Sequence, residues 1–376
     1  MKVFKSTNVF EEALKRIRFI FDEFDYVWVS VSGGKDSTVV YELCKIVARE
    51  KKKLPLRVVF LDQEAEWQAT IDLIKEMMAD PDVEPYWLQV PIRIFNATST
   101  KHEWLMCWEP GKQWMRDKDP ISYKENVWGT DRFHDFFDHF LDKETPEGKK
   151  ACWITGVRTE ESPGRFLGLT SNPTYKWITW GAKHPWNNKL CTLHPIYDWS
   201  YLDVWKAIHE NGWSYNRIYD ELYRYGVPIQ NMRVSNLHHE TAVHSLFILQ
   251  EIEPDTYERL TARINGIDTA GKLGGEDFFV QELPFMFKDW KEYRDYLLEK
   301  LIEPERRPAF QKRFDRLIEH YGVAVPHEKI YKAQVQAILV NDYHGTKLEN
   351  ARSSWGIALD RAGLRKKENR KWNWNS

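Results

Sequence analysis

The chain has 376 residues, of which 42% are hydrophobic and 29% are charged. Such a length and hydrophobic content suffice for two or three packed domains. The 54 basic and 56 acidic residues nearly cancel, so the formal net charge of −2 excludes a general electrostatic attraction to nucleic acid or to an anionic membrane. The N-terminal segment lacks the apolar core of a signal peptide, and no stretch reaches the roughly 20 apolar residues of a membrane span. We therefore expect a cytoplasmic protein with no membrane contact.

The four cysteines are far apart in the sequence and form no CxxC pair. This spacing argues against a disulfide framework and against a zinc or iron–sulfur site built from short spacings. We expect four reduced and mostly buried thiols, at Cys44, Cys107, Cys152 and Cys191.

The first elements predicted along the chain are a helix, a strand, a loop and a second helix. Apolar residues recur at helical spacing over residues 8–24, where Asn8 can cap the helix. The run at 26–31 is apolar except for Ser30 and has no polar face, which is typical of a strand that is buried on both faces of a parallel sheet. It leads into the glycine-rich loop at 32–38, after which helical spacing continues to Val47.

The alternation of strands and helices continues to about residue 205. It predicts right-handed βαβ crossovers and an α/β fold with an open, mostly parallel twisted sheet and helices on both faces. A Trp-rich insertion at about 96–150 interrupts the pattern, and we interpret it as a cover over the sheet. The further elements expected in this region are strands at 56–61, 86–90, 151–155 and 190–193 and helices at 68–79 and 198–205.

Beyond residue 215 the pattern is mainly helical. We therefore expect an α/β domain over residues 1–215 and a mainly helical C-terminal domain with a basic tail over 216–376. The expected helices are at 216–225, 239–252, 253–264, 289–300, 305–320 and 327–340.

Residues 32–38 read SGGKDST and carry the strongest functional pattern in the chain. Gly33 and Gly34 have no Cβ to obstruct a phosphate, and the N–H groups at the start of the following helix form an anion cradle. Asp36 would repel a phosphate, and a Mg²⁺ ion that bridges the two groups removes that repulsion. The loop differs from the Walker A pattern GxxxxGK[ST]. Further donors come from the side chains of Ser32, Lys35, Ser37 and Thr38.

This loop resembles the SGGKDS motif of the PP-loop ATP pyrophosphatases and, within them, of the phosphoadenosine-phosphosulfate (PAPS) reductase family. The segments FLD at 60–62, GVRTEESPGR at 156–165 and HPIYDWSYLDVW at 194–205 match the same family in order. The resemblance covers about residues 25–210 and implies a sheet of the adenine nucleotide alpha hydrolase-like (HUP) type. Each motif lies at or just beyond the carboxyl end of a predicted strand, where open parallel sheets bind ligands.

The resemblance implies a role for each matched position. Mg²⁺ would be held by Asp36 and Glu64. The catalytic residues would be Lys35, Asp36, Arg158 and Arg165. The nucleotide would contact Ser32, Gly33, Gly34, Lys35, Asp36, Ser37, Thr38, Asp62, Glu64, Gly156 and Arg158.

Two groups of acidic residues leave alternatives open. The first group is Asp62, Glu64 and Glu66, which either binds Mg²⁺, ribose or a cationic substrate or simply begins a solvated helix. The second group is Glu160 and Glu161, which either orients the arginines Arg158 and Arg165 or caps a loop.

The chain departs from the true sulfonucleotide reductases, which use a C-terminal cysteine in an ECGxH-type segment. Its last cysteine is Cys191, so thiol-dependent reduction has no evident nucleophile. We therefore expect an enzyme that binds ATP and Mg²⁺ and cleaves ATP between the α- and β-phosphates to adenylylate an acceptor.

The segment DQEAEWQATI at 62–71, the Trp-rich insertion and the helical C-terminal half resemble the DUF3440, or immunoglobulin-binding-regulator, type. This resemblance implies a ParB/sulfiredoxin-like partner. The alternative function is thus a nucleotide-dependent regulatory protein that acts with such a partner or with nucleic acid. The basic, aromatic tail at 361–371 either suits single strands or RNA or is a solvated chain end. In HHETAVH at 238–244 the last histidine lies at i+5 from His239, which favours a polar helix face or the lining of a substrate pocket over a metal site.

Overall fold

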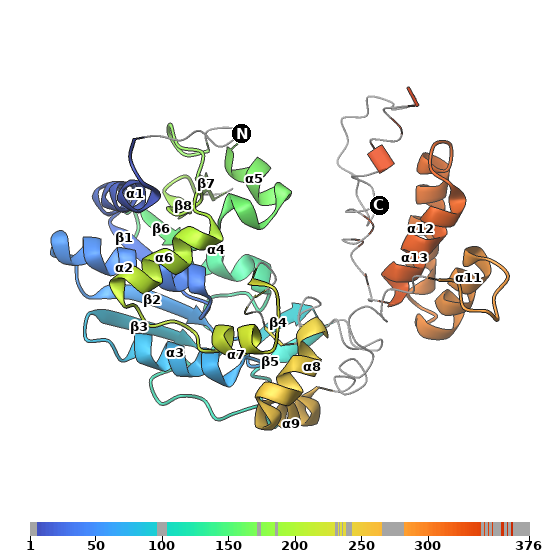
Figure 1. Cartoon of the computed structure of the whole chain (residues 1–376), viewed down its shortest axis with the longest axis horizontal. Helices are drawn as coiled ribbons and strands as arrows, with labels where there is room; N and C mark the ends of the chain where they lie inside the picture. The colour runs from blue at the N-terminus through green and yellow to red at the C-terminus, as the bar shows by residue number, and fades with distance from the viewer. Residues whose placement is uncertain are drawn as a thin grey trace. The chain divides into compact units, whose positions relative to one another are not determined.

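A computed structural model describes residues 6–95, 104–170, 174–184, 187–229, 232, 234, 236–237, 243–264 and 282–339, with scattered residues from 342 to 363. The chain divides into two compact units (Figure 1). The tail beyond residue 363 and residues 238–242 of the HHETAVH segment lie outside the described residues. Unit 1 comprises Met1–Ile94, Met106–Leu237 and Ile248–Arg263, and unit 2 comprises Phe95–Leu105, His238–Phe247 and Ile264–Ser376.

Unit 1 is built on a six-stranded sheet with the order β3-β2-β1-β6-β8-β7 (Figure 1). Its neighbouring strands pair in parallel, except for the antiparallel pair at the β7 edge, so the predicted mostly parallel sheet is confirmed. The third strand begins and ends earlier than the predicted 86–90. The strands are β1 (Tyr26–Ser30), β2 (Leu56–Leu61), β3 (Val83–Leu88), β6 (Ala151–Ile154), β7 (Gly181–Lys183) and β8 (Leu190–Leu193).

Four helices cover one face of the sheet with mostly aliphatic side chains. Alternate residues of β1, such as Val27 and Val29, share a hydrophobic core with the buried faces of four helices. The first of these helices begins at the predicted cap, where Asn8 accepts a hydrogen bond from the Glu11 N–H at 2.8 Å. The four helices are α1 (Val9–Glu23), α2 (Lys35–Glu50), α3 (Gln68–Met78) and α6 (Tyr201–Asn211).

The opposite face of the sheet is aromatic. Trp28 and Trp153 point away from the aliphatic core and pack against Phe140 of α4 (Phe133–Glu144), with ring centroids 5.0 and 5.2 Å apart. Helices therefore lie on both faces, as the sequence predicts. The strand β4 (Ile92–Phe95), just before the insertion, pairs with β5 (Trp104–Cys107) inside it in a separate two-stranded sheet. Between β6 and β7 lie the 3₁₀ turn η1 (Thr159–Glu161) and α5 (Pro163–Thr170).

Unit 1 extends past residue 215, where we expected a domain boundary. It includes α7 (Ile218–Arg224) and α9 (Pro254–Arg263), and α8 (Val243–Ile252) crosses the division between the units. The carboxylate of Glu253, just before α9, accepts hydrogen bonds from the first two N–H groups of α3, at 2.7 and 3.1 Å. An acidic group at a helix N-terminus is favourable, and it ties the α9 segment to the α/β fold.

Unit 2 contains three of the helices predicted from the sequence: α11 (Trp290–Leu301), α12 (Arg307–Tyr321) and α13 (His327–Leu339). Their apolar faces form a separate hydrophobic core that includes Leu297, Phe314 and Ile338. None of the helices in the described part of the chain is long and apolar enough to cross a membrane.

Candidate functional site

The strand order places a topological switch point between β1 and β6. From β1 the chain passes through α2 to β2 on one side of the sheet, whereas β6 pairs on the other side. Open α/β sheets bind ligands at the carboxyl ends of the strands that flank such a point. In this chain those two strand ends carry residues 31–38 and 155–161, so two of the sequence motifs meet there.

The loop at 32–38 is held open by its own backbone and hydroxyl groups. Gly33 has a φ of +70°, and a Cβ at this position would lie 2.6 Å from Cγ2 of Thr70. The hydroxyls of Ser37 and Thr38 both donate to the Gly34 carbonyl, at 2.9 and 3.0 Å. These contacts fix a turn that a side chain at position 33 would obstruct.

The start of α2 presents unused N–H donors. Its N-cap residue, Gly34, provides no side-chain hydrogen bond. Among the described residues, no acceptor is found for the backbone N–H groups of Gly34, Asp36 and Ser37. Together with the positive end of the helix dipole, such donors form a seat for an anion.

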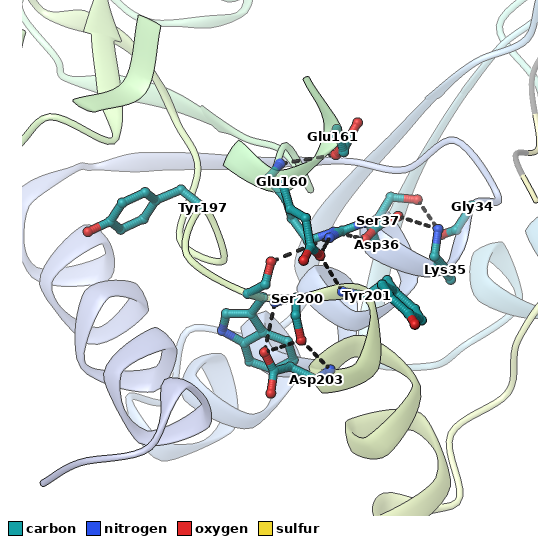
Figure 2. A network of polar contacts seen from close by, with 12 residues as sticks. Gly34, Lys35, Asp36, Ser37, Glu160, Glu161, Tyr197, Ser200, Tyr201 and Asp203 are labelled. Carbon is teal, nitrogen blue, oxygen red and sulfur yellow. Dashed lines mark hydrogen bonds and ion pairs between the residues drawn. The ribbon is translucent and has the colours of Figure 1, made fainter. Parts of the chain in front are cut away.

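Three charged side chains surround this seat. Nζ of Lys35 lies 3.1 Å from Oδ2 of Asp36, and Nε of Arg158 donates to Oδ1 of the same carboxylate. Arg158 is 4% exposed, and its Nη1 donates to Oε2 of Glu160 at 3.1 Å. Glu160 in turn accepts from the Tyr201 N–H at 2.7 Å, at the start of α6, as Figure 2 shows. The result is a network of alternating charges across the switch point.

Gly156 allows the end of β6 to approach the loop. A Cβ at this position would lie 2.7 Å from the carbonyl carbon of Asp36 and 2.8 Å from the Ser37 nitrogen. Because these are backbone atoms, a larger residue here would push the loop and the strand apart. Gly156 and Arg158 therefore lie against the residues at 32–38 with which they were predicted to act.

Arg165 joins the network only indirectly. It lies on α5 with a largely exposed side chain and forms an ion pair with Glu161. Oε1 of Glu161 accepts a hydrogen bond from the Arg158 N–H at 3.0 Å. The two glutamates of this turn thus contact both arginines, and Figure 2 shows them beside the loop.

Asp62 is buried among protein partners, whereas the sequence led us to expect a nucleotide contact. It is 1% exposed, and its oxygens accept from Trp87 Nε1 at 2.9 Å, Gln89 Nε2 at 3.0 Å and Arg116 Nη2 at 2.6 Å. The nucleotide contact that we expected is therefore replaced by contacts with buried protein donors.

Glu64 is also buried among protein partners, whereas we expected it to bind the nucleotide and Mg²⁺. It is 2% exposed, forms an ion pair with Arg263 at 2.7 Å, and accepts a hydrogen bond from the Trp108 N–H at 2.6 Å. Protein donors thus surround the carboxylate, and it does not fit the role of a Mg²⁺ ligand. No group of three or more His, Cys, Asp or Glu side chains suited to a metal ion is found among the described residues.

Glu66 is the third acid of this segment and is also buried. Burial, and next the charge of Asp62, raise the pKa of Glu66 from 4.5 to about 8. Its Oε1 accepts from Asn236 Nδ2 at 3.2 Å. A solvated helix start, which was one of the alternatives for this segment, is therefore excluded.

The raised pKa of Glu66 predicts a pH dependence of stability. Between about pH 4.5 and 8 the folded chain keeps this proton, whereas the unfolded chain releases it, so the free energy of unfolding falls as pH rises through this window. The fall is at most about 1.4 kcal/mol per pH unit. We expect Glu66→Gln to flatten this part of the profile, measured by urea unfolding at pH 5, 6.5 and 8, whereas Glu50→Gln on the surface leaves it unchanged. Equal slopes for Glu66→Gln and the unmodified protein would argue against a buried protonated carboxyl.

The structure adds residues that the sequence patterns did not indicate. Arg116 and Arg263 are the counter-charges of Asp62 and Glu64, from positions 54 and 199 residues away. Asn216, just before α7, and Tyr219, on α7, contact the loop at 32–38. Such pairings are too distant for local spacing to reveal.

The four cysteines are free and buried, as expected. Burial raises the pKa of Cys191 to about 12 and moves the pKa of the other three thiols upward as well. A protonated, enclosed thiol is a weak nucleophile.

An open, mostly parallel sheet with a glycine-rich loop at its switch point assigns unit 1 to the doubly wound α/β class. A family model described as "Phosphoadenosine phosphosulfate reductase domain" matches residues 26–225, which is more than half of the chain. The chain therefore belongs to the PAPS reductase domain family. A second model, "Domain of unknown function (DUF3440)", matches residues 226–354.

Two relatives illustrate the match in sequence. The uncharacterised protein YbdN of Escherichia coli strain K12 is 25% identical over 399 residues, which cover 93% of this chain and 96% of that protein. An adenosine 5′-phosphosulfate reductase of Staphylococcus saprophyticus is 23% identical over 223 residues, which cover 58% of this chain and 76% of the reductase.

Similar solved structures include enzymes of two kinds. A PAPS reductase of Candida auris in complex with phosphate gives a TM-score of 0.32 at 12% identity and covers 63% of this chain and 98% of that chain. An FMN adenylyltransferase of Candida glabrata with FMN and an ATP analogue gives 0.38 at 17% identity and covers 63% and 68%.

Proposed function

We propose that the chain binds ATP at the loop 32–38 and cleaves it between the α- and β-phosphates, transferring the adenylyl group to an acceptor. One observation carries this proposal: the unused N–H donors at the start of α2 lie beside a charge network of the buried Lys35 and Arg158 with the partly exposed Asp36. Family membership agrees with it, because the reductases among the relatives are named for adenosine 5′-phosphosulfate, which contains an adenylyl group.

In the proposed reaction an anionic oxygen of the acceptor attacks the α-phosphorus. The new oxygen–phosphorus bond forms as the bond from the α-phosphorus to the α,β-bridging oxygen breaks, and pyrophosphate leaves with the electron pair. The charge that develops on the bridging and non-bridging oxygens is stabilised by the loop N–H groups, by Lys35 and by the guanidinium of Arg158. Neither a thiol nor a covalent enzyme intermediate is needed, which agrees with the four buried, protonated cysteines.

Mg²⁺ remains part of the proposal at Asp36 alone. Its carboxylate is at the edge of the anion seat with a 19% exposed side chain, and one or two carboxylates with phosphate oxygens and water are the usual Mg²⁺ ligands in such sites. Bound there, the ion would neutralise phosphate charge. Lys35 and Arg158 also pair with this carboxylate, but unlike that of Glu64 it stays partly exposed.

Product analysis tests the proposal. With ATP and a set of candidate acceptors (sulfate, nucleobases, tRNA and DNA), we expect pyrophosphate together with AMP or an adenylylated acceptor. An ATP analogue with a methylene group in place of the α,β-bridging oxygen should be inert. ADP and phosphate as products would contradict the proposed bond. Binding without turnover would favour the regulatory alternative.

A further inference from the structure

Tyr219 places its hydroxyl against the first residue of α2, beside the loop at 32–38. It lies on α7 and is 4% exposed. The backbone N–H of Lys35, the first residue of α2, donates to its oxygen at 3.2 Å. Nζ of Lys35 lies 5.4 Å from the centroid of its ring, and the ring packs edge-on against Trp205 at 5.2 Å. The side chain is therefore held in one place from several directions.

The segment that carries Tyr219 is itself fastened to the loop. Nδ2 of Asn216 donates to the Gly33 carbonyl at 3.0 Å and to Thr70 Oγ1 at 2.8 Å, and its Oδ1 accepts from the Ile218 N–H at 3.1 Å. All three hydrogen bonds are buried. The position of the tyrosine relative to the cradle is thus fixed before any ligand arrives.

The hydroxyl has a proton to donate. Burial raises the pKa of Tyr219 above its usual value, so the phenol keeps its proton throughout the physiological range. Its oxygen accepts from the Lys35 N–H and lies within reach of the Val234 backbone, and in the described part of the chain no acceptor is found for its hydrogen. Asp36 and Arg158 both act on it electrostatically, which places it among the charges of the site.

A buried donor next to the turn that carries the unused N–H groups of Gly34 and Asp36 is suited to an anion. We propose that Tyr219 is a phosphate-binding residue: its oxygen accepts the Lys35 N–H, and its hydroxyl donates to a phosphate oxygen of the nucleotide. This inference rests on the proposed function and names one further residue of the same site. The hydrogen bond from Lys35 polarises the O–H bond and makes it a better donor.

The test compares Tyr219→Phe with the unmodified protein by calorimetric titration with ATP and with pyrophosphate. We expect the dissociation constants of both ligands to rise about two- to tenfold, the range for loss of one hydrogen bond. Adenosine, which has no phosphate, should give the same result with both proteins. Tyr215→Phe is the matched control, because Tyr215 also packs edge-on against Trp205, at 5.4 Å, but its hydroxyl donates to Asp220 instead of facing the loop.

Three results would overturn this role for Tyr219. Unchanged affinity for pyrophosphate would mean that the hydroxyl does not touch the phosphates. Tighter binding would mean that it competes with them for the Lys35 N–H. An equal loss of adenosine binding would indicate a purely structural role. In contrast, an unmodified protein that binds neither ATP nor pyrophosphate would refute the proposed function itself, and the role of Tyr219 with it.

Discussion

Replacing Arg158 with alanine is expected to lower the rate of pyrophosphate release about 10²–10³-fold, the usual effect of removing one preorganised donor from a transition-state charge site. Arg158 is 4% exposed and holds Asp36 through Nε and Glu160 through Nη1. Its loss removes a positive charge from the proposed phosphate site and leaves the carboxylates of Asp36 and Glu160 without this partner. Both changes would destabilise the negative charge that develops on pyrophosphate in the proposed reaction.

The lysine variant and a surface control sharpen this prediction. Arg158→Lys keeps the charge but not the planar fork that reaches both carboxylates, so it should recover only part of the rate. Arg18→Ala removes an arginine of α1 from an exposed ion pair with Glu50 of α2 and should leave the rate unchanged. If Arg158→Ala released pyrophosphate at the normal rate, the charge network would have no catalytic role.

The second large effect concerns stability. Asp62→Ala is expected to lower the free energy of unfolding, measured by urea denaturation, by about 3–5 kcal/mol. The reason is that removing one member of a buried ion pair leaves the charge of the other member uncompensated. The carboxylate is 1% exposed and pairs with Arg116, whose side chain is 17% exposed. The variant also leaves Trp87 Nε1 and Gln89 Nε2 without their acceptor.

An exposed carboxylate provides the comparison for this effect. Glu50 pairs with Arg18 at the surface, where both side chains are more than one third exposed, and Glu50→Ala should cost no more than about 1 kcal/mol. If Asp62→Ala cost as little as Glu50→Ala, Asp62 would not be a structural residue. It would then return to the candidates for ligand contact.

The sequence predicts the sheet well because buried parallel strands have a distinctive composition. The runs at 26–31 and 56–61 are apolar on both faces except for Ser30 and Arg57, and the first run ends directly in the loop at 32–38. The loop at 32–38 was recognised because its two glycines, lysine and aspartate are adjacent in the chain. In contrast, α4 was missed, because the aromatic residues at 133–140 lie among charged residues in a segment interpreted as an irregular insertion.

The acids at 62–66 show where local patterns fail. Alternating carboxylates after a strand have the same appearance whether they face a metal ion or buried arginines. The partner of Glu64 is Arg263, 199 residues further along the chain, and no spacing rule connects the two. The place of Tyr219 beside the loop could not be predicted for the same reason, because its contact with Lys35 joins residues 184 positions apart.

Calorimetric titration of the full chain with ATP should give saturable heat with the unmodified protein if residues 32–38 bind the triphosphate. Lys35→Ala should lose most of this heat, because Lys35 supplies the mobile positive charge beside the loop. The absence of heat with the unmodified protein, or equal affinity in the two proteins, would contradict the assignment of residues 32–38 as a triphosphate site.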